Sequence, residues 1–183
     1  MIYRGMIHNF NIYYFIEQLN KKEIIKLNSK VNIIYRNYKK KPDFKELWEI
    51  KKLCIKTKRK FFIAENIKMA TRLNVDGVYI PSFNKSFEMK YINKKKFEIL
   101  GSAHNFNELN FKMRQGVKKI FLSPIFKIKK NDRFLNVIKF NLFTRRTFAN
   151  IIALGGINEN NINKLKMVNC SGFAAIRYFR NEQ

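Results

Sequence analysis

The stretch Asn150-Ile-Ile-Ala-Leu-Gly-Gly-Ile-Asn158 decides how the rest of the chain is interpreted. Its residues between Asn150 and Gly155 are all apolar, which indicates a strand covered on both faces. Gly155 and Gly156 lack a Cβ, so backbone N–H groups of this turn can approach an anion closely. A helix expected to begin at Asn158 would add its positive N-terminal end. The stretch therefore predicts a phosphate site, although a strand-to-helix turn that requires positive φ also explains the glycines.

Strand-like runs of this kind recur at intervals of roughly 20 to 25 residues, separated by helical patterns. Besides the stretch just quoted, they comprise residues 11–17, 31–38, 60–65, 78–80, 97–103, 119–125 and 172–179. Eight such units predict an α/β fold, a compact (β/α)8 TIM barrel in a single domain over residues 1–183. An open flavodoxin-like sheet would leave several of these strands unexplained. Few residues follow the last strand, so we expect the barrel to lack a full C-terminal helix and a homodimer interface to cover that surface.

The composition indicates that the binding partners are anionic, but it does not identify which kind of anion is bound. The 183 residues carry 38 Lys and Arg against 13 Asp and Glu, and the net charge of +25 attracts phosphorylated metabolites, nucleic acid or acidic membrane surfaces. The lysines are spread over nearly every expected helix, whereas a nucleic-acid protein more often gathers its charge on one face. Nucleic acid is therefore the less favoured partner. An apolar run of about 18 residues and a signal-peptide pattern are both absent, so we expect a cytoplasmic protein with no membrane span.

In a barrel, ligands bind over the carboxyl ends of the strands, and the residues there are the candidate site. His104 follows the fifth strand and is suited to proton transfer near neutral pH. Arg36 and the loop lysines are expected to bind diphosphate, and Glu65 to hold Mg²⁺ through its carboxylate. An ordinary basic rim and a salt bridge are the alternative explanations for these charges. The residues expected at this mouth are Arg36, Glu65, Asn84, Ser102, His104, Lys127, Lys129, Lys130, Gly155, Gly156 and Arg177.

Five motifs resemble those of the thiamine-phosphate synthase and TenI family. They are Asp76–Val78, Gly101–His104, Ser123–Phe126 (in place of a Gly-Pro-Ile-Phe-like turn), Ala153–Ile157 and Gly172–Ala174. The resemblance extends from Ile12 to Phe179 and implies a phosphate-binding barrel in thiamine biosynthesis. It implies an enzyme that joins hydroxymethylpyrimidine diphosphate to thiazole phosphate and releases pyrophosphate with Mg²⁺.

The diphosphate motifs depart from the family pattern. The Gln-x-Arg-x-Lys of the second strand reads Ile34, Arg36 and Tyr38 in this chain. After the sixth strand, Thr-x-Thr-Lys is replaced by a basic run, in which Lys129 or Lys130 would take the place of the lysine. The resemblance therefore implies a weakened diphosphate site.

The metal and phosphate motifs depart as well. The Asn-Asp pair of the third strand reads Ala64 and Glu65, and the second metal-binding Asp matches Asn84. Near the eighth strand, Arg177 stands where the family has a small serine, which would change the phosphate pocket. The resemblance thus implies a Mg²⁺ site in which some of the family's metal ligands have been replaced.

These losses leave other functions open. A TenI-like thiazole tautomerase needs a phosphate cradle and one acid/base group, which would be His104 with Ser102 as its hydrogen-bond neighbour. A barrel that binds a phosphorylated ligand without catalysis, and a basic nucleic-acid-binding protein, are the remaining alternatives.

Overall fold

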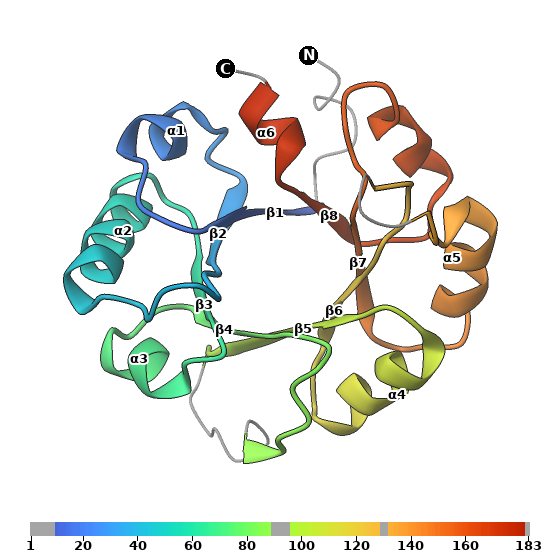
Figure 1. The fold of residues 1–183 in the computed structure, drawn as a ribbon, viewed down its shortest axis with the longest axis horizontal. Helices are drawn as coiled ribbons and strands as arrows, with labels where there is room; N and C mark the ends of the chain where they lie inside the picture. The colour runs from blue at the N-terminus through green and yellow to red at the C-terminus, as the bar shows by residue number, and fades with distance from the viewer. Residues whose placement is uncertain (1–9, 89–95, 129–131, 182–183) are drawn as a thin grey trace.

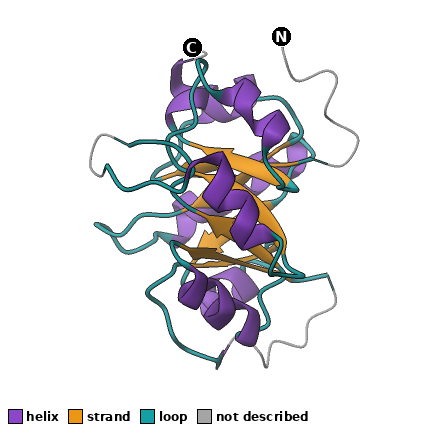
Figure 2. Cartoon of the chain, turned by 90° about the vertical axis from the view of Figure 1, so that its right-hand side faces the viewer, coloured by secondary structure: helices purple, strands orange, loops and turns teal. Residues whose placement is uncertain are grey.

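The computed structural model describes residues 10–88, 96–128 and 132–181, which form the closed barrel that the sequence predicts (Figure 1). Its elements are β1 (Asn11–Ile16), α1 (Lys21–Lys26), β2 (Val31–Tyr35), α2 (Phe44–Lys56), β3 (Phe61–Ala64), α3 (Ile67–Arg72), β4 (Gly77–Ile80), β5 (Glu98–Ala103), α4 (Phe106–Arg114), β6 (Lys119–Leu122), α5 (Asn136–Thr144), β7 (Asn150–Leu154), η3 (Ile162–Met167), β8 (Gly172–Ala175) and α6 (Arg177–Asn181). Each strand pairs in parallel with the next, and β8 pairs with β1 to close the ring. The helices lie around the strands (Figure 2).

The strands are buried on both sides, which explains why they read as continuous apolar runs. In β1, Tyr13 and Phe15 belong to the core inside the barrel, and Tyr14 belongs to the core between barrel and helices. The inner core is aromatic: the Tyr13 and Phe121 rings lie 5.0 Å apart and the Phe15 and Tyr79 rings 5.2 Å apart, both edge to face. Because these rings fill the interior, a ligand has to bind above them, at the mouth.

The C-terminal end differs from the prediction that the eighth strand continues to Phe179. The strand β8 ends at Ala175, and the five-residue helix α6 follows it. Phe179 stacks on Phe173 with a centroid distance of 6.1 Å and meets the Tyr14 ring edge to face at 5.4 Å. Packing of these rings on the outside of β1 and β8 favours a helix over an extended strand. Among the described residues, the segment after β8 forms only the short helix α6, and the homodimer stays a prediction.

The segment after β7 also differs, because no α-helix begins at Asn158. The Asn158 N–H donates to Asn161 Oδ1 (2.9 Å), and the Asn160 N–H donates to Asn158 Oδ1 (2.9 Å). Asparagine side chains that bond nearby backbone in this way favour turns over helix. A 3₁₀ helix, η3, begins only at Ile162.

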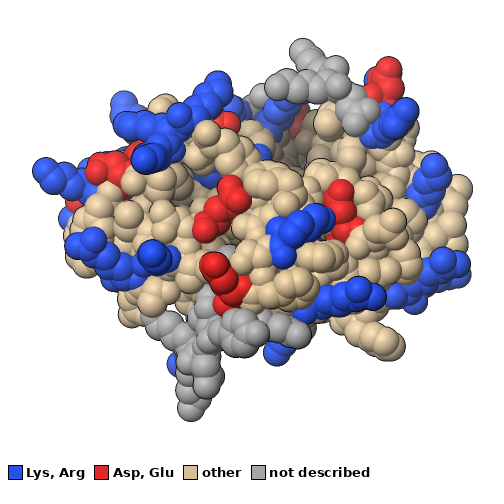
Figure 3. Space-filling view, turned by 60° about the horizontal axis from the view of Figure 1, so that its bottom comes forward, with Lys and Arg blue, Asp and Glu red and all other residues tan. Residues whose placement is uncertain are grey.

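One face of the molecule shows how the basic side chains are distributed on it (Figure 3). On the face drawn in Figure 3, Lys and Arg form separate groups and do not merge into one patch. Within the described ranges, every helix is too short or too polar to cross a membrane.

Candidate active site

Arg36 lies at the carboxyl end of β2, held between aromatic rings. Its guanidinium carbon is 4.2 Å from the centroid of Phe15 and 5.8 Å from that of Tyr38. The hydroxyl of Tyr79 interacts with Arg36 and with Ser102, and burial raises the pKa of Tyr79, so the phenol stays neutral. A guanidinium has five N–H donors, so these contacts leave donors for a phosphate.

His104 lies across the mouth, at the end of β5. Its ring Nδ1 is 2.9 Å from the carbonyl oxygen of Ser123. A carbonyl only accepts, so Nδ1 is the donor of this bond, and in the neutral tautomer that fits it the lone pair lies on Nε2. Its backbone N–H donates to Glu108 Oε2 (2.8 Å), which ties the residue to the start of α4. Ser102, the expected partner of the ring, interacts with Tyr79, and the Nδ1 atom faces the Ser123 carbonyl; a role of Ser102 beside His104 stays a prediction.

The glycine turn lies against the same loop that holds His104. Gly155 and Gly156 have φ of +90° and +74°, so a side chain at either position would be strained. A Cβ on Gly155 would come 2.7 Å from Pro124 Cβ, and a Cβ on Gly156 would come 2.5 Å from the Phe126 oxygen. Within the described ranges, the N–H groups of Gly156 and Ile157 have no hydrogen-bond partner. An anion bound at this turn would therefore meet these backbone N–H groups, without the α-helix expected to begin at Asn158.

The two candidate metal ligands, Glu65 and Asn84, differ in whether their side-chain oxygens already accept a hydrogen bond from a described residue. The partly exposed Glu65 has φ of +59°, and its N–H donates to the Tyr79 carbonyl. The Asn84 Oδ1 already accepts the N–H of Ser86 at 2.9 Å. Across the described part of the chain, no group of three or more His, Cys, Asp or Glu could hold a metal. Glu65 fits a Mg²⁺ that arrives mainly bound to diphosphate, since this ion commonly keeps one or two carboxylates together with phosphate oxygens and water.

The other basic residues predicted at the site differ in where they lie and in what they contact. Lys129 and Lys130 lie outside the described residues. Lys127 forms an exposed ion pair with Asp132 at 2.9 Å. Arg177 does not end a strand but begins α6, where it is exposed.

A family model described as thiamine monophosphate synthase matches residues 18–179. The chain belongs to the thiamine monophosphate synthase family. It is 30% identical over 167 residues to a thiamine-phosphate synthase of Prochlorococcus marinus, a match that covers 87% of this chain and 48% of the relative. A second match, to the thiamine-phosphate synthase of Fusobacterium nucleatum, has 24% identity over 156 residues and covers 84% of this chain and 76% of the relative.

The chain spans about half the length of the Prochlorococcus relatives it matches (48%, 45% and 44%). Among solved structures, a thiamine phosphate pyrophosphorylase from Pyrococcus furiosus superposes with a TM-score of 0.73 at 16% identity, covering 92% of this chain and 86% of the other. At that identity the likeness establishes the barrel fold alone.

This member of the thiamine monophosphate synthase family has a buried cation that the sequence analysis missed. Lys112 on α4 is fully buried, and its Nζ donates to the Asn84 carbonyl (2.8 Å) and to Gln115 Oε1 (2.9 Å). Gln115 in turn donates from Nε2 to the carbonyls of Ser86 (2.6 Å) and Asn84 (3.2 Å). Burial, assisted by Lys85, lowers the pKa of Lys112 to about 8. The spacing in the sequence could have indicated that Lys112 is buried, because it follows the buried Leu109 by three residues and so lies on the same helix face.

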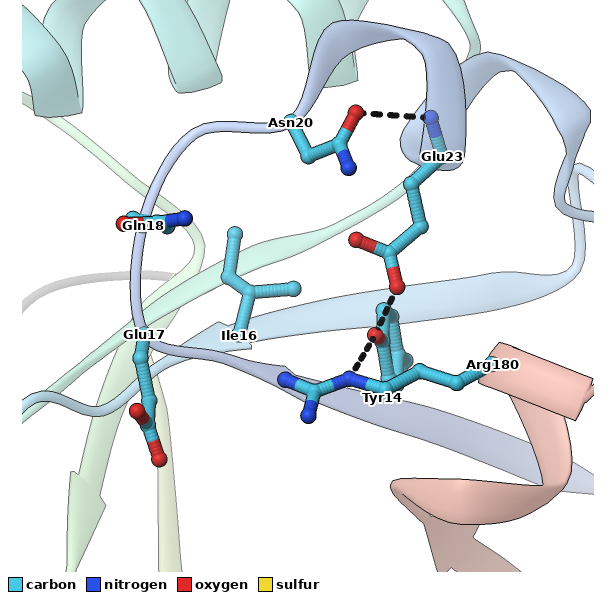
Figure 4. Close-up of a pocket in the computed structure, with 7 residues that line it drawn as sticks. All are labelled: Tyr14, Ile16, Glu17, Gln18, Asn20, Glu23 and Arg180. Atoms are coloured by element: carbon cyan, nitrogen blue, oxygen red, sulfur yellow. Dashed lines mark hydrogen bonds between the residues drawn. The ribbon is translucent and has the colours of Figure 1, made fainter.

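A cavity of about 460 Å³ lies outside the barrel, between the β1–α1 loop and α6 (Figure 4). The Tyr14 hydroxyl donates to Glu23 Oε1, and Arg180 Nε donates to the Tyr14 oxygen at 3.4 Å. Burial and the Glu23 carboxylate raise the pKa of Tyr14 to about 12. None of the predicted site residues lines this cavity, whose walls are Tyr14, Ile16, Glu17, Gln18, Asn20, Glu23 and Arg180.

Proposed function

We propose that this chain joins hydroxymethylpyrimidine diphosphate to thiazole phosphate and releases pyrophosphate, as a thiamine-phosphate synthase. One observation carries the proposal: the mouth has two separate groups suited to anions. Arg36 follows β2. The N–H groups of Gly156 and Ile157, which have no hydrogen-bond partner among the described residues, follow β7 across the ring (Figure 1). Two anion sites across one mouth match a reaction between two phosphorylated substrates.

In this reaction a bond from the pyrimidine to its diphosphate breaks while the bond to the thiazole forms. The leaving diphosphate gains negative charge, and Arg36 stabilises it because the Phe15 ring and the Tyr79 hydroxyl already fix the guanidinium. Mg²⁺, held by Glu65 and the diphosphate, would supply further charge stabilisation when bound. The glycine turn binds the thiazole phosphate and positions the attacking ring.

The test is product formation with purified protein, both substrates and Mg²⁺, measured against an Arg36→Met variant. We expect thiamine phosphate from the unaltered protein and a loss of about 100-fold or more in turnover for the variant. Arg72→Met is the matched control, because that guanidinium also lies over a ring, 4.9 Å from Phe44, but belongs to α3. Absence of product from the unaltered protein, or equal losses in both variants, would contradict the proposal.

The second candidate is a thiazole tautomerase, and the Nε2 of His104, which has no hydrogen-bond partner among the described residues, favours it. This function predicts that His104→Gln abolishes proton exchange on thiazole phosphate while phosphate binding persists. Unchanged exchange in the variant excludes it. A binding-only barrel predicts thiazole phosphate binding with neither reaction, and a nucleic-acid binder predicts an affinity that falls steeply with salt.

A further inference from the structure

Two large aromatic side chains stand exposed at the mouth beside Arg36. Tyr38 follows β2 and is 56% exposed, and Phe83 follows β4 and is 62% exposed. Their ring centroids lie 5.9 Å apart at an interplanar angle of 60°, although they come from separate loops. Aromatic surface left in water at the rim of a site is available to a ligand.

The Tyr38 ring is held close to the anion-binding group. The guanidinium of Arg36 lies 5.8 Å from its centroid. Burial of part of the residue, with Tyr79 nearby, raises the pKa of Tyr38 to about 12, so it presents a neutral ring. A phosphate on Arg36 and a planar group on Tyr38 would therefore be separated by only a short linker.

The backbone next to Phe83 is held by hydrogen bonds from two side chains. The carbonyl oxygen of the next residue, Asn84, accepts hydrogen bonds from Lys112 Nζ and Gln115 Nε2. Gln115 also donates to the Ser86 carbonyl, so two buried side chains, one on α4 and one at its C-cap, hold the backbone next to Phe83. A ring on a fastened loop loses little freedom when a ligand stacks on it.

We propose that Tyr38 and Phe83 form a stacking platform for a planar aromatic heterocycle whose phosphate groups are bound by Arg36. Stacking on aromatic side chains recognises the π-face of a heterocycle and needs no matched hydrogen bonds. The platform rests on the proposed function, for which it assigns the heterocycle of the diphosphate substrate to the rim between β2 and β4.

Equilibrium binding measured by calorimetry tests the platform with two probes: hydroxymethylpyrimidine diphosphate and inorganic pyrophosphate. Both carry the diphosphate, but only the first carries a ring. In Tyr38→Leu and Phe83→Leu, which keep apolar bulk, we expect affinity for the pyrimidine compound to fall about tenfold and affinity for pyrophosphate to change less than about twofold.

Phe87→Leu is the matched control. Phe87 belongs to the same segment and is 40% exposed, but its ring packs on Phe111 at 5.4 Å and not on Tyr38. We expect it to bind both probes as the unaltered protein does. Thermal unfolding of each variant checks that the fold is retained.

The outcomes separate the platform from the proposed reaction. Equal affinity of the unaltered protein for the two probes, or equal weakening of both probes in the leucine variants, overturns the platform even if thiamine phosphate is formed. Selective weakening of the pyrimidine compound supports the platform even if no product is formed. Binding of neither probe overturns the platform and the proposed function together.

Discussion

Lys112→Met removes the buried ammonium on α4 and offers a sharp test of the electrostatics of the barrel. Both acceptors of the Lys112 Nζ are uncharged, namely the Asn84 carbonyl and the Gln115 amide oxygen. The other charges that influence it are Lys85, which lowers its pKa, and Glu108 and Glu65, which raise it. Met keeps the length and apolar body of the side chain, so the change isolates the charge and its two hydrogen bonds.

The size of the effect follows from the shift in pKa. Burial lowers the pKa of Lys112 from 10.5 to about 8, and each unit is about 1.36 kcal/mol, so the buried charge costs about 3 kcal/mol. Between about pH 8 and 10.5, the unfolded chain binds more protons at this site than the folded chain. The stability of the unaltered protein relative to the variant should therefore be flat below about pH 8 and rise above it by about 1.4 kcal/mol per pH unit.

Urea unfolding of both proteins from about pH 7 to 10.5 at fixed ionic strength measures this difference. Ionisation of the tyrosines and cysteines is common to both proteins and cancels in the comparison. Lys118→Met, at an exposed position, is the control and should give a flat difference. A flat difference for Lys112→Met as well would refute the reasoning, because it would mean that the ammonium is solvated or paired with a carboxylate.

Three further substitutions test local features. Gly156→Ala places a methyl about 2.5 Å from the Phe126 oxygen, so we expect a loss of about 1–3 kcal/mol in unfolding free energy and weaker thiazole phosphate binding; unchanged calorimetric affinity would contradict the turn as an anion site. Asn105→Ala removes the N-cap of α4 and should cost about 1 kcal/mol in urea unfolding; no loss would mean that the cap bond is not formed in solution. Tyr14→Phe leaves Glu23 without its hydroxyl donor, and a drop of about 1 kcal/mol at neutral pH is expected; a variant as stable as the parent would show that water replaces the hydroxyl.

The sequence predicted that the second, fifth and seventh strands end at one rim of the barrel, although it extended the eighth strand too far. The mouth does bring together the end of β2 with Arg36, the end of β5 with His104 and the turn Gly155–Gly156, because parallel strands of a closed barrel all end at one rim. The helix predicted from Asn158 failed because asparagine side chains bond the local backbone there, a competition that apolar periodicity does not register.

The amino-acid sequence by itself determined the eight-stranded barrel and its family, since apolar runs, glycine turns and helix caps act over a few residues and repeat along the chain. Only the tertiary structure decided which side chains meet. It placed the His104 ring on the Ser123 carbonyl, Lys112 under the Asn84 loop, and Phe83 beside Tyr38. These partners are far apart in the chain, and their contacts depend on the closure of the barrel and the direction of each side chain, which local sequence patterns do not encode.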